Sequence, residues 1–370
     1  MKVGIFTFPN SASYGATLQM YALCYAVGAL GHEVEAINYY SSFMKKENHC
    51  RAGQSSAFAH AMKRTARRIL HASLYARSSA FEKKNIPLYP RNFFSGRNML
   101  PTVGLRYDAV ICGSDQVWNP NITGGDLSYF LDFCSDSTRR ISYAPSFGLD
   151  TLPEDFVAGA KRELTKFSSL SVREAQGQAI IADMIGREVP IVLDPTLLLE
   201  ASQWQALEDT GFSVGEEFVL YYTVKSSPRL FAKCRSFAQQ QGLKMIVVGG
   251  QWANRNQSKD SVVRYAVDIS PATWLWLIHH ARYVVTNSFH GTAFSVIFEK
   301  DFYLELSSLT NSRLNNIVSA LALRDRVVPL EENITPVPAN FSIMSERLAA
   351  LRKASLNYLK DALSEDAIHG

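Results

Sequence analysis

The sequence is poor in cysteine, has little net charge and lacks a long apolar run. Its five cysteines are an odd number without CxxC spacing, so neither a disulfide framework nor a zinc ribbon is predicted. The 38 Lys and Arg against 34 Asp and Glu leave a net charge of +4, too little to indicate nucleic-acid binding. No apolar run reaches the roughly 18 to 20 residues of a membrane span, and Met1 leads into a strand-like segment rather than a signal peptide. We therefore expect a cytoplasmic protein with reduced thiols.

What the chain does have is a globular composition over 370 residues, with 47% apolar and 19% charged residues, enough for two domains. Short β-branched or aromatic runs alternate with helical stretches, which predicts parallel sheets with helices on both faces. The predicted strands are 3–8, 33–39, 109–112, 140–144, 170–172, 218–222, 244–248 and 283–285. The predicted helices are 17–30, 228–241, 271–281, 291–298 and 342–363. We expect an N-terminal α/β domain over 1–188, a C-terminal α/β domain over 189–340, and a last helix within 341–370 that could pack back on the first domain.

Residues 45–106 form a basic insert with thirteen Lys or Arg against two Glu. Within the insert, apolar and basic side chains fall on opposite faces of a predicted helix over 58–71. Most amphipathic helices pack their apolar stripe against the core and turn their charges to water. The alternative is peripheral contact with anionic lipid headgroups at the inner face of the membrane.

Four junctions between predicted strands and helices have residue types suited to binding. Ligands of open α/β sheets bind beyond the carboxyl ends of the strands, where these junctions lie. The four segments are 9–16, 113–119, 171–174 and 286–292. The first contains small polar residues whose N–H groups could approach an anion, but it is not a GxGxxG motif, so a dinucleotide site is not indicated.

Two of these junctions carry charged side chains with both a functional and a structural interpretation. Asp115, close to Trp118, suits hydroxyl recognition or general-base chemistry, although Asp also caps turns. Arg173 could hold a carboxylate or phosphate through two N–H groups. By residue type alone, a salt bridge from Arg173 to Glu174 or Asp194 is the more common outcome.

The fourth junction places His290 and Gly291 at the start of an apolar helix, just after Ser288. The hydroxyl, the imidazole and the free N–H groups of that helix could together hold a phosphate. The histidine could also shuttle a proton near neutral pH, or it could be a buried structural histidine. Its place between a strand and a helix favours a functional role, and the sequence offers no obvious metal-ligand cluster.

Taken in order along the chain, five segments resemble the polysaccharide pyruvyl transferase family, over about residues 1 to 330. They are YGATLQ (14–19), GSDQVWN (113–119), SVRE (171–174), LDPTLL (193–198) and NSFHG (287–291). The resemblance implies two Rossmann-like domains facing a cleft, as in GT-B glycosyltransferases. It also implies transfer of the enolpyruvyl group of phosphoenolpyruvate to a sugar diol, which forms a cyclic ketal and releases phosphate. The acceptors of the family are sugars of capsule, exopolysaccharide or wall polymers, some of them lipid-linked.

The resemblance further implies a role for particular residues. His290 and Asp115 would be catalytic, with Asp115 as the base for an acceptor hydroxyl. The expected donor-binding residues are Arg173, Ser288, His290, Gly291 and Arg313. The expected acceptor-binding residues are Asn10, Tyr14, Gln116, Trp118 and Asn119. The reaction needs no metal and no cofactor besides the donor substrate.

The sequence departs from the family pattern at two positions. Many members have Arg where this chain has Ser288, which makes Arg313 a candidate for the missing donor contact. Many members also have Asp where this chain has Ala16, so the chain looks like a distinct branch. Two other functions stay open: a nucleotide-sugar glycosyltransferase of the same fold, and a non-catalytic glycan-binding member. The segment 292–298 lacks the acidic residue that usually binds the ribose of a nucleotide donor, which weighs against the first.

Overall fold

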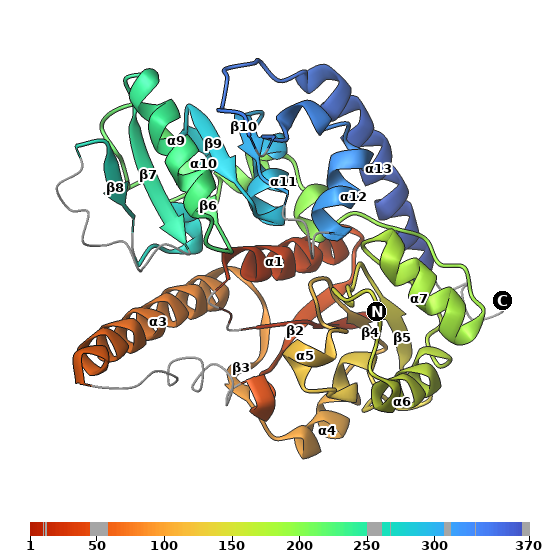
Figure 1. Cartoon of the computed structure of the whole chain (residues 1–370). Helices are drawn as coiled ribbons and strands as arrows, with labels where there is room; N and C mark the ends of the chain where they lie inside the picture. The colour runs from red at the N-terminus through yellow and green to blue at the C-terminus, as the bar shows by residue number, and fades with distance from the viewer. Residues whose placement is uncertain are drawn as a thin grey trace. The chain divides into compact units, whose positions relative to one another are not determined.

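The computed structural model of the chain describes residues 1–9, 11, 13–44, 58–249, 261–266, 268–306, 312–329 and 331–364; for residues 58–71, 249 and 312 it describes the backbone only. The chain forms two compact units. The first comprises Met1–Leu198 together with Leu351–Gly370, and the second comprises Leu199–Ala350. Each unit has its own parallel sheet with helices packed against it (Figure 1).

The sheet of the first unit has five strands in the order β3-β2-β1-β4-β5, and all their pairings are parallel. The strands are β1 (Lys2–Phe6), β2 (Glu33–Tyr39), β3 (Leu88–Phe94), β4 (Ala109–Cys112) and β5 (Arg139–Ser142). All four residues of β4 are buried, as expected for a central parallel strand covered on both faces. A core rich in aromatic residues, including Phe6, Tyr39 and Trp118, lies against this sheet.

The helices of the first unit follow these strands and cover the sheet. They are α1 (Tyr14–Ala29), α3 (Phe58–Asn85), α4 (Leu100–Gly104), α5 (Pro120–Thr123), α6 (Glu154–Leu164) and α7 (Ala175–Ile185), with short 3-10 turns η1 (Arg97–Met99), η2 (Leu127–Phe130) and η3 (Pro195–Leu198). Helix α1 packs on β1 and β2 and is buried on most sides. The predicted helix over 58–71 lies within α3. Its predicted apolar and basic faces depend on side chains that are outside the described part of the structure.

The sheet of the second unit also has five parallel strands, in the order β10-β9-β6-β7-β8. The strands are β6 (Phe218–Thr223), β7 (Lys244–Gly249), β8 (Val263–Tyr265), β9 (Tyr283–Thr286) and β10 (Asp301–Leu304). The helices are α8 (Ala201–Gln205), α9 (Pro228–Gln240), α10 (Pro271–His280), α11 (Phe289–Ile297), α12 (Ser312–Ala320) and α13 (Phe341–Ala362), with η5 (Arg324–Arg326). Helices α9 and α10 begin at a Ser-Pro pair in which the serine hydroxyl caps the helix, so both starts agree with the prediction.

The last helix, α13, is divided between the two units. Its residues from Leu351 onward belong to the first unit. There, the hydroxyl of Tyr358 donates to the Ser142 carbonyl at 2.8 Å, and the Leu193 N–H donates to the hydroxyl of Ser355 at 2.9 Å. The end of α13 is therefore bonded to β5 and to the segment that precedes η3.

The two sheets have the same strand order when each unit is numbered from its own first strand. In both, the first strand lies at the centre between the second and the fourth, as in a Rossmann-like half. The chain reverses direction across the sheet between β1 and β4 in the first unit, and between β6 and β9 in the second. These two switch points, at the carboxyl ends of the strands, are the expected positions for ligands.

The predicted fold class of two α/β units with parallel sheets is confirmed, with one correction to the strands. The predicted strand 170–172 belongs to neither sheet. It has one isolated bridge, Val172 with Ile191, and the preceding Ser169 has another, with Ile141. Strands β3, β8 and β10 were not predicted. No helix in the described ranges combines the length and apolarity that crossing a bilayer demands.

Candidate functional site

The switch point of the first unit is held together by hydrogen bonds between the ends of β1 and β4. The hydroxyl of Thr7 donates to the Ser114 carbonyl at 2.9 Å, and the Gly113 N–H donates to the Phe6 carbonyl at 2.9 Å. Gln19 of α1 donates from its side-chain amide to the Thr7 hydroxyl at 3.0 Å. These contacts fix the loop that follows β4. Asp115 lies in this loop, directly after Ser114.

Asp115 has a left-handed backbone at this switch point, with φ of 79°. Its carbonyl accepts from the Ser146 N–H at 2.8 Å, and its carboxylate accepts from the Gln116 N–H at 2.8 Å. Ala144, in the neighbouring loop after β5, also has a positive φ, of 54°. Backbone strain of this kind costs of order 1–3 kcal/mol per residue and clusters at functional sites. The Asp115 side chain is 16% exposed, and its predicted role as the base for a hydroxyl stays a prediction.

Arg173 is enclosed in the same region and faces three carboxylates. Its guanidinium lies 2.7 Å from Asp194, 3.6 Å from Glu174 and 3.9 Å from Asp115, measured from the nearest nitrogen to a carboxylate oxygen. Burial alone would lower the pKa of Arg173, but Asp194, Glu174 and Asp115 outweigh burial and raise the pKa, so the guanidinium stays charged.

The arginine side chain is only 2% exposed. Arg173 forms salt bridges to both Asp194 and Glu174, the structural alternative that the sequence analysis gave for it. The predicted contact of Arg173 with the donor stays a prediction.

The other predicted acceptor residues differ in accessibility. Asn10 lies outside the described residues. Tyr14 begins α1 and is mostly buried, and Gln116 is partly exposed. Asn119 caps α5 by accepting from the Asn121 N–H, and it donates to the Gln116 side chain at 3.1 Å.

Trp118 belongs to the core rather than to the surface of this loop. Its indole is fully buried, stacks on Phe130 with ring centroids 5.1 Å apart, and donates to the Tyr129 carbonyl at 2.9 Å. An enclosed indole cannot touch a ligand in this conformation. Of the side chains in segment 113–119, Asp115 and Gln116 are the partly exposed ones.

The switch point of the second unit has a similar set of contacts between the ends of β6 and β9. The hydroxyl of Thr286 donates to the Tyr222 carbonyl at 2.7 Å. The Asn287 side chain accepts from the Val224 N–H at 3.1 Å and donates to the Lys225 carbonyl at 2.8 Å. The loop that carries the predicted donor residues is thereby fixed to the end of the central strand.

Ser288 is the N-cap of α11, and its hydroxyl accepts from the Gly291 N–H at 3.3 Å. Burial raises the pKa of the neighbouring Tyr222 to about 12, although Ser288 opposes the shift, so this phenol is neutral at physiological pH. His290 is 8% exposed in the first turn of α11, with its ring edge-on to that of Phe289. Because positive charge accumulates at a helix N-terminus, this turn suits an anion.

Gly291 lies where the chain packs tightly. A Cβ at this position would overlap Thr286 Oγ1 and would come within 3.0 Å of the Tyr222 ring. The remaining predicted donor residue, Arg313, is the second residue of α12 and is partly buried. Its predicted contact with the donor stays a prediction, as do those of Ser288, His290 and Gly291.

One cluster in the second unit was missed at the level of sequence. Glu208, His279 and His280 bring three metal-ligating side chains together. Only the adjacent pair of histidines signalled it, because Glu208 is some seventy residues earlier and comes close through the fold. The sequence analysis expected no obvious metal-ligand cluster, and the fold brings these three side chains together.

Two Rossmann-like units in one chain are typical of the GT-B-like fold, and solved structures share this fold. The UDP-GlcNAc 2-epimerase of Methanocaldococcus jannaschii superposes with a TM-score of 0.53 at 12% identity, over 96% of this chain and 93% of that chain. A putative UDP-N-acetylglucosamine 2-epimerase of Listeria monocytogenes gives 0.52 at 9% identity, over 98% and 91%. The S. aureus MnaA–UDP co-structure gives 0.51 at 10% identity, over 100% and 89%. At these identities the likeness concerns the fold alone.

The family follows from the sequence rather than from the fold. The sequence model of the polysaccharide pyruvyl transferase family matches residues 14–304. The chain belongs to this family, as the resemblance predicted. Curated protein sequences give no match. Family membership supports a transferase that acts in polysaccharide modification. The predicted pair of GT-B-like units is confirmed. The predicted cleft between them stays a prediction.

Proposed function

We propose that the protein transfers the enolpyruvyl group of phosphoenolpyruvate to two hydroxyls of a sugar, in a surface polysaccharide or its lipid-linked precursor. The observation that carries the proposal is the family match over residues 14–304. The reaction takes place in the cytoplasm, and it needs no cofactor besides the donor. The basic helix within 58–71 would bring the enzyme to lipid-linked acceptors at the inner face of the membrane.

The reaction has four changes of bonding. The methylene carbon of phosphoenolpyruvate takes a proton, which makes C2 electrophilic. One sugar hydroxyl attacks C2 and loses its proton to a base. The second hydroxyl then attacks C2 as the bond to the phosphate oxygen breaks, and inorganic phosphate leaves. The two hydroxyl protons are thus balanced by the new methyl hydrogen and by the released phosphate.

The two switch points supply residue types that this reaction needs. In the second unit, His290 and the first-turn N–H groups of α11 suit the donor phosphate, because the helix terminus attracts anions. His290 is also the candidate to deliver or accept a proton. In the first unit, the partly exposed carboxylate of Asp115 is the candidate base for the first sugar hydroxyl.

The proposal is tested by phosphate release from phosphoenolpyruvate, measured with a panel of sugar acceptors. We expect release that depends on the acceptor and a product heavier than the acceptor by the pyruvate ketal, detected by mass spectrometry. His290→Ala should abolish both, with an unchanged melting temperature. The matched control is His32→Ala, which changes a partly buried histidine of the other unit. Full activity in a folded His290→Ala variant would contradict its assignment.

The rival function, transfer from a nucleotide sugar, is separated by ligand-dependent melting. A ligand that binds only the folded protein raises its melting temperature. A shift with phosphoenolpyruvate and none with UDP- or ADP-sugars supports pyruvyl transfer. A shift with a nucleotide sugar alone would overturn it. Helix α11 offers no acidic side chain for a ribose, which favours the first result.

A further inference from the structure

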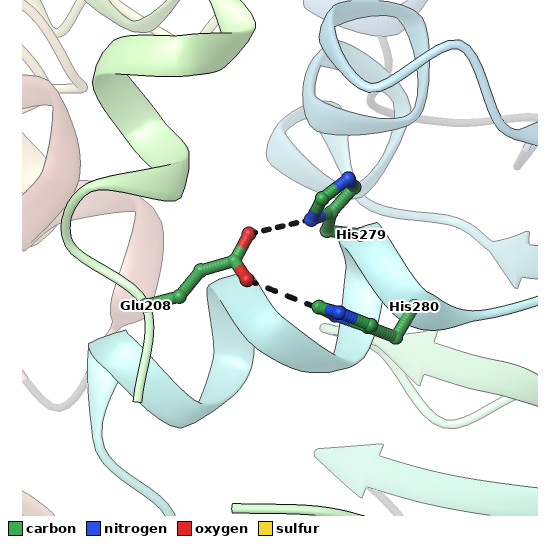
Figure 2. Close-up of side chains that lie close together, drawn as sticks. All are labelled: Glu208, His279 and His280. Atoms are coloured by element: carbon green, nitrogen blue, oxygen red, sulfur yellow. Dashed lines mark ion pairs between the residues drawn. The ribbon is translucent and has the colours of Figure 1, made fainter. Parts of the chain in front are cut away.

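Three side chains with metal-ligating atoms meet at the end of α10 in the second unit (Figure 2). His279 and His280 are the last two residues of that helix, and Glu208 lies shortly after α8. Glu208 Oε1 is 2.8 Å from His279 Nδ1, and Glu208 Oε2 is 3.7 Å from His280 Nδ1. One candidate ligand atom from each residue lies within 4.8 Å of the other two.

We propose that Glu208, His279 and His280 bind a divalent transition-metal ion, with Zn²⁺ as the preferred ion. Two imidazoles and one carboxylate are a donor set that Zn²⁺ accepts, with bonds of about 2.0–2.2 Å. Two ligands of one tetrahedral ion are then roughly 3.3 Å apart. Glu208 Oε1 and His279 Nδ1, 2.8 Å apart, are close to this value. His280 would use Nε2, which the contact of its Nδ1 with the Trp276 carbonyl leaves for the ion. Three protein ligands leave a fourth position for water.

Contacts behind the ligands support this interpretation. His280 Nδ1 lies 2.9 Å from the Trp276 carbonyl, to which it can donate its proton. A metal-bound histidine commonly donates one ring N–H to a carbonyl in this way, which leaves the other nitrogen for the ion. His279 Nε2 lies 3.2 Å from the side-chain amide of Gln205. The amide oxygen can accept from His279 Nε2 after a 180° turn of that amide, since the two orientations have nearly the same shape.

The two imidazole rings are also held by packing. His280 stacks on Trp276 with centroids 4.2 Å apart and planes inclined by 9°. His279 stacks on Phe298 with centroids 4.8 Å apart. The Glu208 side chain is only 7% exposed. Ligands fixed in orientation lose little side-chain entropy when an ion binds, which favours affinity.

A polar pocket of about 240 Å³ borders His280 of the cluster. Its lining includes His280, three carboxylates and two cations, and the carboxylates are Glu217, Glu299 and Asp301. Lys300 and Arg282 are the cations, and they reduce the attraction for a metal without cancelling it. The lining is therefore net acidic.

The cluster lies away from the loop that carries the predicted donor residues. Helix α10 ends at His280, just before the amino end of β9, whereas the loop with Ser288 and His290 follows its carboxyl end. A metal here would join the segment after α8 to the connection between α10 and β9. The inference is independent of the proposed function, since it concerns the opposite edge of the same sheet.

The test is Zn²⁺ binding by the full chain after removal of metals with a chelator, measured by isothermal titration calorimetry. Co²⁺, whose visible absorption reports its ligands, is the spectroscopic substitute. We expect one ion per chain and a melting temperature raised by Zn²⁺. Glu208→Gln and His279→Ala should each weaken binding by at least about tenfold and remove the rise. The control His32→Ala should bind as the unaltered protein does.

Two results would overturn the proposal. One is the absence of Zn²⁺ and Co²⁺ binding, which would leave the cluster as an ion pair of Glu208 and His279. The other is equal binding by Glu208→Gln, His279→Ala and the control, which would place the ion elsewhere. Circular dichroism of each variant without metal shows that it is folded, so a loss of binding is not a loss of structure. Pyruvyl transfer is measured separately and does not bear on either result.

Discussion

The guanidinium of Arg173 donates from Nη1 to Asp194 Oδ2 at 2.7 Å, and both side chains are enclosed. The other Asp194 oxygen accepts from the N–H and the hydroxyl of Thr196 at 3.0 and 2.8 Å. Asp194 Oδ2 also accepts from the Ser114 hydroxyl at 2.9 Å. One carboxylate therefore joins the loop after β4, the arginine and the turn η3.

Asp194→Asn should destabilise the first unit. Asparagine keeps the size of the side chain, but it leaves a buried arginine with less compensating charge. Breaking a buried pair by removing one charge costs about 3–5 kcal/mol, and the remaining Glu174 and Asp115 should hold the loss towards the lower figure. Urea unfolding measures the change. Asp183→Asn on the exposed side of α7 is the control, and equal stability of the two variants would contradict the role of Asp194.

Asp115→Asn should remove activity and cost less stability than Asp194→Asn, because Asp115 is the more distant of the two carboxylates from Arg173. Asparagine accepts the left-handed backbone at φ of 79° as readily as aspartate does. Its amide cannot take a proton from a sugar hydroxyl, and losing a general base costs about 10²–10⁴-fold in rate. Steady-state phosphate release and thermal melting measure the two quantities. A variant with the wild-type rate would show that Asp115 is not the base and that its role is limited to the left-handed turn of the backbone.

Gly291→Ala should be poorly tolerated although alanine favours helices. The new methyl group would meet Thr286 Oγ1 and the Tyr222 ring, and both belong to the tightly packed end of the sheet. Overpacking of this kind costs about 1–3 kcal/mol. Thermal melting of the variant checks the size of the loss, with Gly28→Ala in α1 as the control, where a Cβ has room at 3.8 Å from Val34. Equal melting temperatures of Gly291→Ala and Gly28→Ala would show that the residues around Gly291 move to accommodate the methyl group at little cost.

Glu163 gives a prediction of pH dependence. Burial alone would raise its pKa, but hydrogen bonds from Lys166 and Arg162 outweigh burial and hold the pKa of this carboxyl below its ordinary value of 4.5. Because the folded pKa is depressed, the stabilisation is complete above the unfolded pKa and is lost as pH falls through the folded one. Arg140, 3.2 Å away, belongs to the same cluster.

Glu163→Gln should therefore melt below the unaltered protein at pH 7, and the difference should shrink below about pH 4. Melting curves from pH 7 to pH 3 measure it. Glu188→Gln, on the exposed surface, supplies the comparison. A difference that stays constant down to pH 3 would mean that the side chain stabilises the fold through its packing rather than its charge.

The central strands could be predicted from the sequence because burial on both faces makes them apolar. The predicted helices fall on α1, α3, α9, α10, α11 and α13, whereas the other helices of the described residues were not among those predicted. β4 is Ala-Val-Ile-Cys, and β9 is Tyr-Val-Val-Thr. The missed strands lie at sheet edges, where the pattern is weaker: β3 contains Pro90 and Arg91, and β8 has only three residues. The predicted strand 170–172 is apolar because it is enclosed, but it pairs only through isolated bridges.

The sequence could predict where the candidate site residues lie in the fold, but not which side chains they contact. Strand-to-helix junctions point to Asp115 and His290, because ligands of parallel sheets bind at carboxyl edges. The sequence left open whether Arg173 meets a ligand or a carboxylate, and three carboxylates face it in the structure. The cluster of Glu208 with His279 could not be predicted, because its members approach only after the second sheet has formed.

The division of α13 between the two units has a consequence for the order of synthesis. The first unit receives Ser355 and Tyr358 only after all of Leu199–Ala350 has been made. At translation rates of 5–20 residues per second, that interval is roughly 8 to 30 s. During it, the Ser142 carbonyl lacks the phenol that later binds it. The second unit is continuous in the chain and needs no segment made after Ala350.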